Sequence, residues 1–161
     1  MLKTCIPQST VLQRYIDVFY ILQTEQPAPI TYLAFPHINT AISFFKGVSI
    51  TRDDLHIGIN EDGPAKNTCV EILGKYTRHV VVDFNGVFEE VVIIFKPMGI
   101  NRFIKGSLQQ LAPAHSQAYH DKTWTAFCKA LFKAENKIEI LESFYWHSLP
   151  SRKNLRPLNN H

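Results

Sequence analysis

The stretch RHVVVDFNGVFEEVVIIF, residues 78–95, contains the strongest structural signals of this sequence. Two runs rich in β-branched and aromatic residues flank Asn85–Gly86, a dipeptide that favours the tight turn of a β-hairpin. The sequence therefore predicts an antiparallel hairpin in which residues 78–84 pair with residues 87–95.

More strands are expected on the N-terminal side of this stretch. Short β-branched and aromatic runs recur there between turn residues, at 31–35, 38–45, 48–51, 55–59 and 69–73. Before them, residues 7–20 predict a short helical turn followed by a strand. About eight short strands at this spacing are typical of an antiparallel sandwich or barrel.

The pattern becomes helical after about residue 107. Trp124, Phe127 and Leu131 recur at helical intervals, which predicts an amphipathic helix from about 121 to 134. The Asn136–Glu139 spacing resembles a capping box and predicts the start of a second helix. That helix should end before residue 150, because a proline there disfavours a helical conformation just before it.

Composition limits the class of protein and its partners. A length of 161 residues suits one domain, and a hydrophobic fraction of 45% is too high for a disordered chain. A net charge of +3 is small for a chain that binds nucleic acid by itself, and no apolar run is long enough for a membrane helix. Without a signal peptide or a Cys-x-x-Cys pair, the three cysteines favour a cytoplasmic protein with reduced thiols.

No motif in the sequence indicates catalysis or metal binding. The seven histidines form no His-x-His or His-Glu-x-x-His pattern, and His115 and His120 share neither a helix face nor a strand face. The sequence contains no nucleophile elbow and no phosphate loop. Adjacent carboxylates on a strand, as at Glu89–Glu90, point to opposite faces and do not form a catalytic dyad. We therefore expect no enzyme activity, no metal and no cofactor.

A ligand pocket in the lumen or mouth of a barrel is the remaining kind of site. The candidate ligand-binding residues mix aromatic and polar groups near strand ends, and they are Phe35, His37, Asn39, Phe44, Tyr76, Arg78 and Phe84. Core packing and hydrogen-bonded turns would explain each of them equally well.

Four segments follow one another in a familiar order. They are the opening Pro7 to Tyr20, YLAFPHINTAISFF (32–45), IIFKPMGINRFI (93–104) and TAFCKALFKAENKIEILESFYWHSL (125–149). The third contains an F-x-P-x-G pattern at Phe95, Pro97 and Gly99. Together they resemble the N-terminal domain of AraC/XylS-type transcriptional regulators.

This resemblance implies a cupin-like antiparallel β-barrel over residues 1–107 that senses a small molecule or a protein effector. It implies a helical hairpin over 108–150 that forms a homodimer, followed by a linker over 151–161. DNA binding would belong to a C-terminal helix-turn-helix domain that this sequence lacks, and no membrane contact is implied. The candidate dimerisation residues are Trp124, Phe127, Leu131, Ile138, Leu141 and Tyr145.

Alternatives remain open at this point. The chain could be a small cupin-type enzyme, an isomerase or lyase that uses the barrel lumen. It could also be a stand-alone interaction protein that joins a regulator through its helices. The six candidate dimerisation residues could equally belong to the core of one chain.

Overall fold

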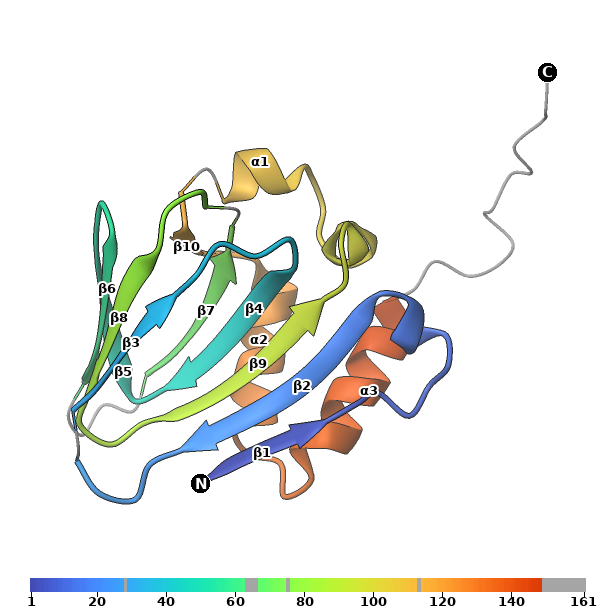
Figure 1. Cartoon of the computed structure of the whole chain (residues 1–161). Helices are drawn as coiled ribbons and strands as arrows, with labels where there is room; N and C mark the ends of the chain where they lie inside the picture. Colours follow the sequence, from blue (N-terminus) through green and yellow to red (C-terminus); the bar gives the residue numbers. More distant parts are fainter. Residues whose placement is uncertain (28, 63–66, 75, 113, 149–161) are drawn as a thin grey trace.

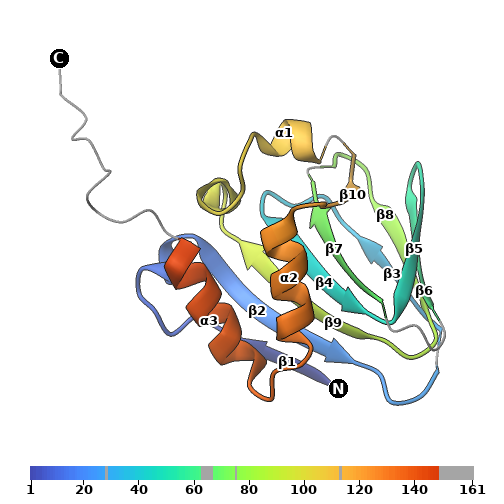
Figure 2. The same ribbon diagram turned by 180° about the vertical axis from the view of Figure 1, so that it is seen from behind.

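The computed structural model describes residues 1–27, 29–62, 67–74, 76–112 and 114–148. The fold has three layers: a small four-stranded sheet, a large six-stranded sheet and a pair of helices (Figure 1). The helices α2 (Lys122–Leu131) and α3 (Lys137–Ser148) cover the face of the large sheet that points away from the small sheet (Figure 2). The predicted β-rich fold with C-terminal helices is therefore confirmed.

The large sheet has the strand order β1–β2–β9–β4–β7–β10. Its strands are β1 (Leu2–Cys5), β2 (Ile16–Gln23), β4 (Thr40–Lys46), β7 (Thr68–Leu73), β9 (Glu89–Phe95) and β10 (Ser116–Ala118). The small sheet has the order β3–β8–β6–β5. Its strands are β3 (Ile30–Ala34), β5 (Val48–Asp53), β6 (His56–Glu61) and β8 (Val80–Asn85).

The strands pair in antiparallel fashion except for β6 and β8, which run parallel. Among the described residues no strand pairing joins the two sheets, so they form two open layers. The expected closed barrel is therefore not confirmed, and the expected purely antiparallel pairing is wrong at β6–β8. No local sequence signal predicts the parallel pairing of β6 with β8, because parallel strands are not joined by a tight turn.

The expected hairpin between residues 78–84 and 87–95 is also wrong. β8 pairs with β3 and β6 in the small sheet, whereas β9 pairs with β2 and β4 in the large sheet. The Asn85–Gly86 turn instead carries the chain from one sheet to the other. Gly86 has a φ of +98°, and a Cβ on it would lie 2.5 Å from the Glu61 Cβ. Glycine is thus required at position 86 by the positive φ and by the close packing against Glu61. The turn that contains it does not join two paired strands.

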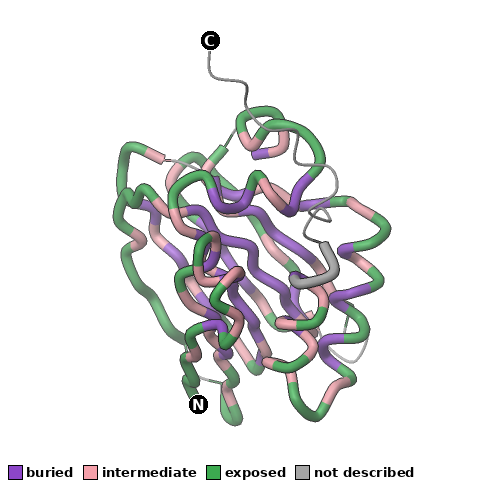
Figure 3. Tube along the Cα trace, turned by 90° about the vertical axis from the view of Figure 1, so that its right-hand side faces the viewer, coloured by how far each residue is buried: buried purple, intermediate pink, exposed green. Residues whose placement is uncertain are grey.

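The burial patterns of β8 and β9 give the physical reason for this difference. β8 buries alternate residues, which suits a strand covered on one face. β9 buries nearly every residue, because the helices cover one of its faces and the small sheet covers the other. Figure 3 shows the buried segments gathered along the central strands. The run VVIIF is thus the signal of a central strand buried on both faces.

Both predicted helices are present, and side chains cap them, at Asp121 and at the predicted Asn136. The Asp121 carboxylate accepts hydrogen bonds from the backbone N–H groups of Thr123 and Trp124, at 2.8 and 3.1 Å. Asn136 Oδ1 accepts a hydrogen bond from the Glu139 N–H at 3.3 Å, which confirms the cap. The reciprocal bond to the Glu139 carboxylate comes from the Asn136 side-chain amide, at 3.3 Å, and not from its backbone.

The N-terminal prediction is confirmed, and three elements were not foreseen. A 3-10 turn, η1 (Leu12–Arg14), precedes β2 as expected. Neither β1, β10 nor α1 (Leu108–Leu111) was predicted. β10 pairs with β7, so the large sheet draws its last strand from the range expected to be purely helical.

The F-x-P-x-G segment leads from β9 into the turn η3 (Gly99–Arg102). A Cβ on Gly99 would lie 2.1 Å from the carbonyl oxygen of Tyr15, so the close approach of these two segments requires glycine. The expected linker over 151–161 lies outside the described residues. Within the described part of the chain, none of the helices combines the length and the apolar character needed to cross a membrane.

Candidate functional site

A cavity lies between the two sheets and is lined by their facing surfaces. Its water-accessible volume is about 50 Å³, enough for several water molecules at the ~10–15 Å³ that one needs. Side chains alternate along each strand of the large sheet, so Ser43, Glu71 and Glu90 face the cavity. Their neighbours Phe44 and Val91 face the helices.

The small sheet supplies an apolar wall. This wall consists of Ala34, Ile50, Ile57, Ile59, Val80, Val82 and Phe84. The Phe84 ring stacks on Phe88, with ring centroids 4.4 Å apart, and lies 6.0 Å from the ring of Tyr32. These contacts pack the aromatic rings at one end of the wall, and the charged groups of the cavity come from the large sheet.

Glu71 is a buried carboxylate whose hydrogen bonds are satisfied within the protein. Arg52 binds it through two nitrogens, with Nε 3.1 Å from Oε2 and Nη2 on Oε1. The Ser116 hydroxyl donates to the same Oε2 at 2.8 Å. Because Arg52 lies on β5 and Glu71 on β7, this ion pair joins the two sheets at one side of the cavity.

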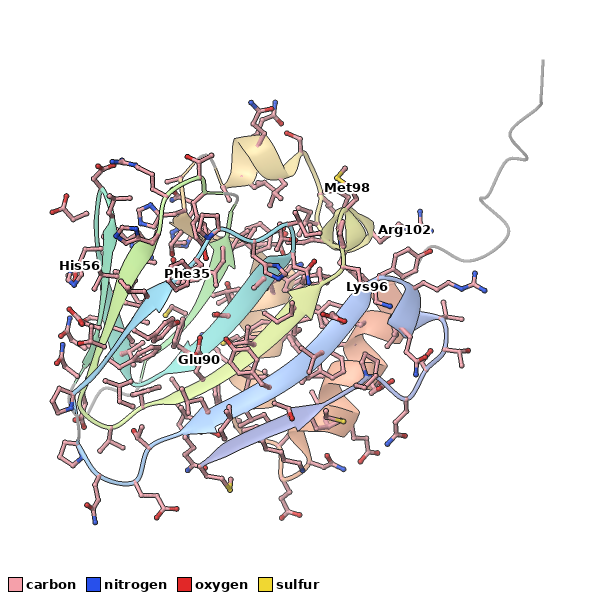
Figure 4. All side chains as sticks on the ribbon, viewed as in Figure 1. Phe35, His56, Glu90, Lys96, Met98 and Arg102 are labelled. Carbon is pink, nitrogen blue, oxygen red and sulfur yellow. The ribbon has the colours of Figure 1, made fainter. Side chains whose placement is uncertain are left out.

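Glu90 is the second buried carboxylate of the cavity, and Figure 4 shows it between the sheets. Its residue is 5% exposed, and no Lys, Arg or His in the described part of the chain forms an ion pair with it. Burial raises the pKa of the Glu90 carboxyl to about 7. The Ser43 hydroxyl lies close enough to limit this rise, although its geometry falls short of a full hydrogen bond.

Two tyrosines, Tyr20 and Tyr32, lie near Glu90. Desolvation, and then the charge of Glu90, raises the pKa of both hydroxyls above the usual range, although 46% of the Tyr32 residue is exposed. Burial also raises the pKa of Tyr76, which lines the same cavity. All three phenols are therefore neutral near pH 7 and can donate a hydrogen bond.

Two further polar atoms of the cavity have no partner in the described part of the chain. They are Ser43 Oγ and His115 Nε2, and both are buried. A buried polar atom without a partner costs about 1–3 kcal/mol, so such atoms are usually met by water or a ligand. Together with the carboxylate of Glu90, these atoms give the cavity wall polar groups that the described residues do not fully pair.

The structure brings two of the seven predicted ligand-binding residues to this cavity, Tyr76 and Phe84. Phe44 faces the helices, where its ring centroid lies 5.4 Å from that of Phe127. Phe35 and His37 are exposed beyond the end of β3, Asn39 is half-buried and reaches Asp17 at 3.4 Å, and the exposed Arg78 pairs with Asp54 at 3.0 Å.

Six further cavity residues were not predicted from the sequence, namely Tyr32, Ser43, Glu71, Glu90, His115 and Ser116. Their available signal was a polar residue inside an apolar strand, as at Ser43 in AISFF and Glu71 in CVEIL. Such a residue must find a partner if the strand is buried on both faces. His115 had no signal, because β10 was not foreseen.

The six candidate dimerisation residues pack inside this chain. Trp124, Phe127, Leu131, Leu141 and Tyr145 are buried against the large sheet, and Ile138 is half-buried beside them. The Phe127 and Phe144 rings stack with centroids 3.8 Å apart, which joins the two helices. These side chains would contact a second copy of the chain only if the helices left the sheet. A dimer formed by other surfaces of the chain stays a prediction.

A triad-like group lies on the outer face of the small sheet. His56 Nε2 is 2.6 Å from Asp83 Oδ2, and the Thr31 hydroxyl donates to Asp83 Oδ1. These hydrogen bonds, that of Thr31 first, lower the pKa of Asp83. In a catalytic triad the hydroxyl contacts the histidine, whereas here it contacts the carboxylate. The group is therefore a set of cross-strand contacts. No three potential metal ligands cluster anywhere in the described ranges.

Comparison with known proteins gives one match. No curated protein and no solved structure matches this chain. Residues 4–117 match a family described as a domain of unknown function, DUF6597. This range runs from β1 into β10 and so includes both sheets and the cavity. Because the match covers more than half of the chain, the protein belongs to the DUF6597 family.

Proposed function

We propose that this protein is the ligand-sensing module of an AraC/XylS-type transcriptional regulator, and that its effector binds between the two sheets. The observation that carries the proposal is the cavity itself: among the described residues, Ser43 Oγ and His115 Nε2 are buried there without a hydrogen-bond partner, and Glu90 is buried without an ion-pair partner. A ligand that replaces water at these groups would hydrogen-bond them and so offset their desolvation cost. The ordered motifs, and a sequence without known catalytic patterns, favour a sensor over an enzyme.

In this proposal the two layers of strands correspond to an opened cupin-like barrel, and the helices transmit the state of the cavity. α2 packs on β7, whose other face contributes Glu71 to the cavity. A ligand that shifts β7 would therefore move α2. Dimerisation would use outer surfaces of the helical layer, DNA binding would require a separate domain, and the site of action would be the cytoplasm.

A thermal-unfolding screen tests the binding part of this proposal. Small neutral, anionic and cationic compounds are added to the protein, and a compound at a hundredfold excess over its Kd should stabilise the fold by about 2.7 kcal/mol. Ser43→Leu, which fills part of the cavity, should abolish the shift. Ser49→Leu is the control, because Ser49 is exposed on β5. The absence of any shift that Ser43→Leu removes would refute the sensor.

The second candidate is a small cupin-type isomerase or lyase, and one observation favours it. The pKa of Glu90 is near 7, where a side chain is best suited to act as a general acid or base. Turnover of a cavity ligand identified in the screen, lost in Glu90→Gln while binding persists, would replace the sensor by the enzyme.

A further inference from the structure

We propose that the cavity between the sheets binds a small primary amine, with its ammonium group at Glu90 and its apolar body against the wall of the small sheet. This inference rests on the proposed ligand-binding function of the cavity. It goes further because it assigns the charge and the orientation of the ligand.

The first step is the difference between the two buried carboxylates. Glu71 has its counter-charge in Arg52 and a further hydrogen bond from Ser116. Glu90 has no counter-charge among the described residues, although it is almost as deeply buried. The cavity therefore holds one negative charge more than its own cations balance when Glu90 is ionised. A ligand cation would supply the missing charge.

The second step is the set of groups around that carboxylate. An ammonium group has three N–H donors. The Glu90 carboxylate and the unpaired Ser43 hydroxyl oxygen can accept two of them, and both line the same side of the cavity. Tyr32 and Phe84 line the cavity together with Glu90, and the faces of aromatic rings attract cations. A second cavity surface, formed in part by Tyr20, Tyr32 and Glu90, shows that this carboxylate is also reachable from the gap between β2 and β3.

The third step is the opposite wall. Ile57, Ile59 and Val82 offer no hydrogen-bonding side-chain atoms, so they suit the hydrocarbon part of the ligand. An anionic ligand would place its charge beside Glu90 or in this wall, and both positions are unfavourable. The charges that face the cavity from the other strands do not change this balance, because Arg52 is held by Glu71.

The pH dependence of binding separates an amine from a neutral ligand. Glu90 must lose its proton to pair with an ammonium group, and its pKa is about 7 in the empty cavity. Amine affinity should therefore rise about tenfold per pH unit below this value and level off above it, with release of a proton on binding. A neutral ligand that hydrogen-bonds the protonated carboxyl group of Glu90 would instead bind more weakly as the pH rises. The other titratable groups that face the site are Glu71, which is paired with Arg52, and Tyr20, Tyr32, Tyr76 and His115.

The experiment compares three probes of similar size, ethylamine, ethanol and acetate, each small enough for a cavity of about 50 Å³, by calorimetric titration between pH 5.5 and 8. We expect ethylamine to bind best, with affinity that rises with pH. Glu90→Gln should weaken it at least tenfold and remove the pH dependence. Glu89→Gln is the matched control, since the neighbouring Glu89 pairs with Lys46 and Lys137, and it should leave binding unchanged.

Each other outcome overturns the inference. Binding of ethanol or of acetate in preference to the amine would disprove the cation while leaving a ligand-binding cavity. The amine would also be disproved, and the ligand-binding cavity retained, if none of the three probes binds but the broader thermal screen finds another ligand that Ser43→Leu excludes. If neither experiment finds a ligand, both the inference and the proposed sensor are refuted. The Glu90→Gln variant separates Glu90 from the other groups of the site, because a pH dependence caused by another group would persist in this variant.

Discussion

At the scale of single residues, Glu90 makes stability depend on pH. The pKa of its carboxyl rises from 4.5 to about 7 on folding, so the folded protein binds an extra proton between these values. The stabilisation is complete below pH 4.5 and is lost as the pH rises through 7. We expect the free energy of unfolding to fall by about 2–3 kcal/mol between pH 5 and pH 8 from this residue.

Urea unfolding of Glu90→Gln at both pH values measures this contribution. The variant should be more stable than the wild type at pH 8 by about 2–3 kcal/mol, because an amide bears no charge in the cavity. Glu135→Gln, at an exposed carboxylate, serves as the control and should follow the wild type. If the stability of Glu90→Gln had the same pH dependence as that of the wild type, ionisation of Glu90 would not destabilise the folded protein.

At the scale of elements, the Arg52–Glu71 pair links β5 of the small sheet to β7 of the large sheet at one side of the cavity. Arg52→Ala would leave a carboxylate that is 2% exposed with only Ser116 as a partner. We expect a loss of about 2–3 kcal/mol in urea unfolding, somewhat less than for a fully buried pair because Arg52 reaches solvent. Arg78→Ala breaks the exposed pair with Asp54 and should cost less than about 0.5 kcal/mol.

A second variant separates the lost pair from a general weakening of β5. The double change Arg52→Met with Glu71→Leu replaces both charges by apolar groups and should recover most of the stability. Equal losses for Arg52→Ala and Arg78→Ala would show that the link between the sheets contributes nothing.

Elements were more predictable from the sequence than their pairing. The strands from β3 to β9 and both long helices carry local signals, namely β-branched runs, turn residues and caps. The partner of a strand has no such local signal. The Asn85–Gly86 turn favoured a pairing of β8 with β9 that does not occur in the structure. The burial of β9 on both faces was readable in VVIIF, and it would have argued against a two-stranded hairpin exposed on one side.

At the scale of the whole molecule, the helical layer is part of one core with the large sheet. Leu131 is fully buried, whereas Lys129 is exposed on the same helix. Leu131→Ala should therefore cost about 3 kcal/mol at every protein concentration, and Lys129→Ala should change stability by less than about 0.5 kcal/mol. Unfolding curves at several protein concentrations check this. A loss that depends on concentration would instead place Leu131 at an interface between copies.

The candidate site was less predictable than the layers that enclose it. Phe44 and Phe45 are neighbours in the sequence, yet only Phe45 faces the cavity. A shift of one residue in register exchanges the two faces of a strand, so sequence alone could not choose between them. Glu90 lies on β9 and His115 lies just before β10, and both line the cavity only because the strand order of the large sheet places these distant segments over the same space.

The parallel contact of β6 with β8 affects how the chain reaches this structure. β8 enters the small sheet between β3 and β6, so its pairing must wait until distant segments have closed into loops. A fold made of successive hairpins could assemble from local contacts, but this one cannot. Such non-local strand order is characteristic of domains that fold in milliseconds to seconds rather than microseconds. While β8 is absent, the edges of β3 and β6 would both be open to pairing with other chains, so the folding rate also sets the time during which the protein can aggregate.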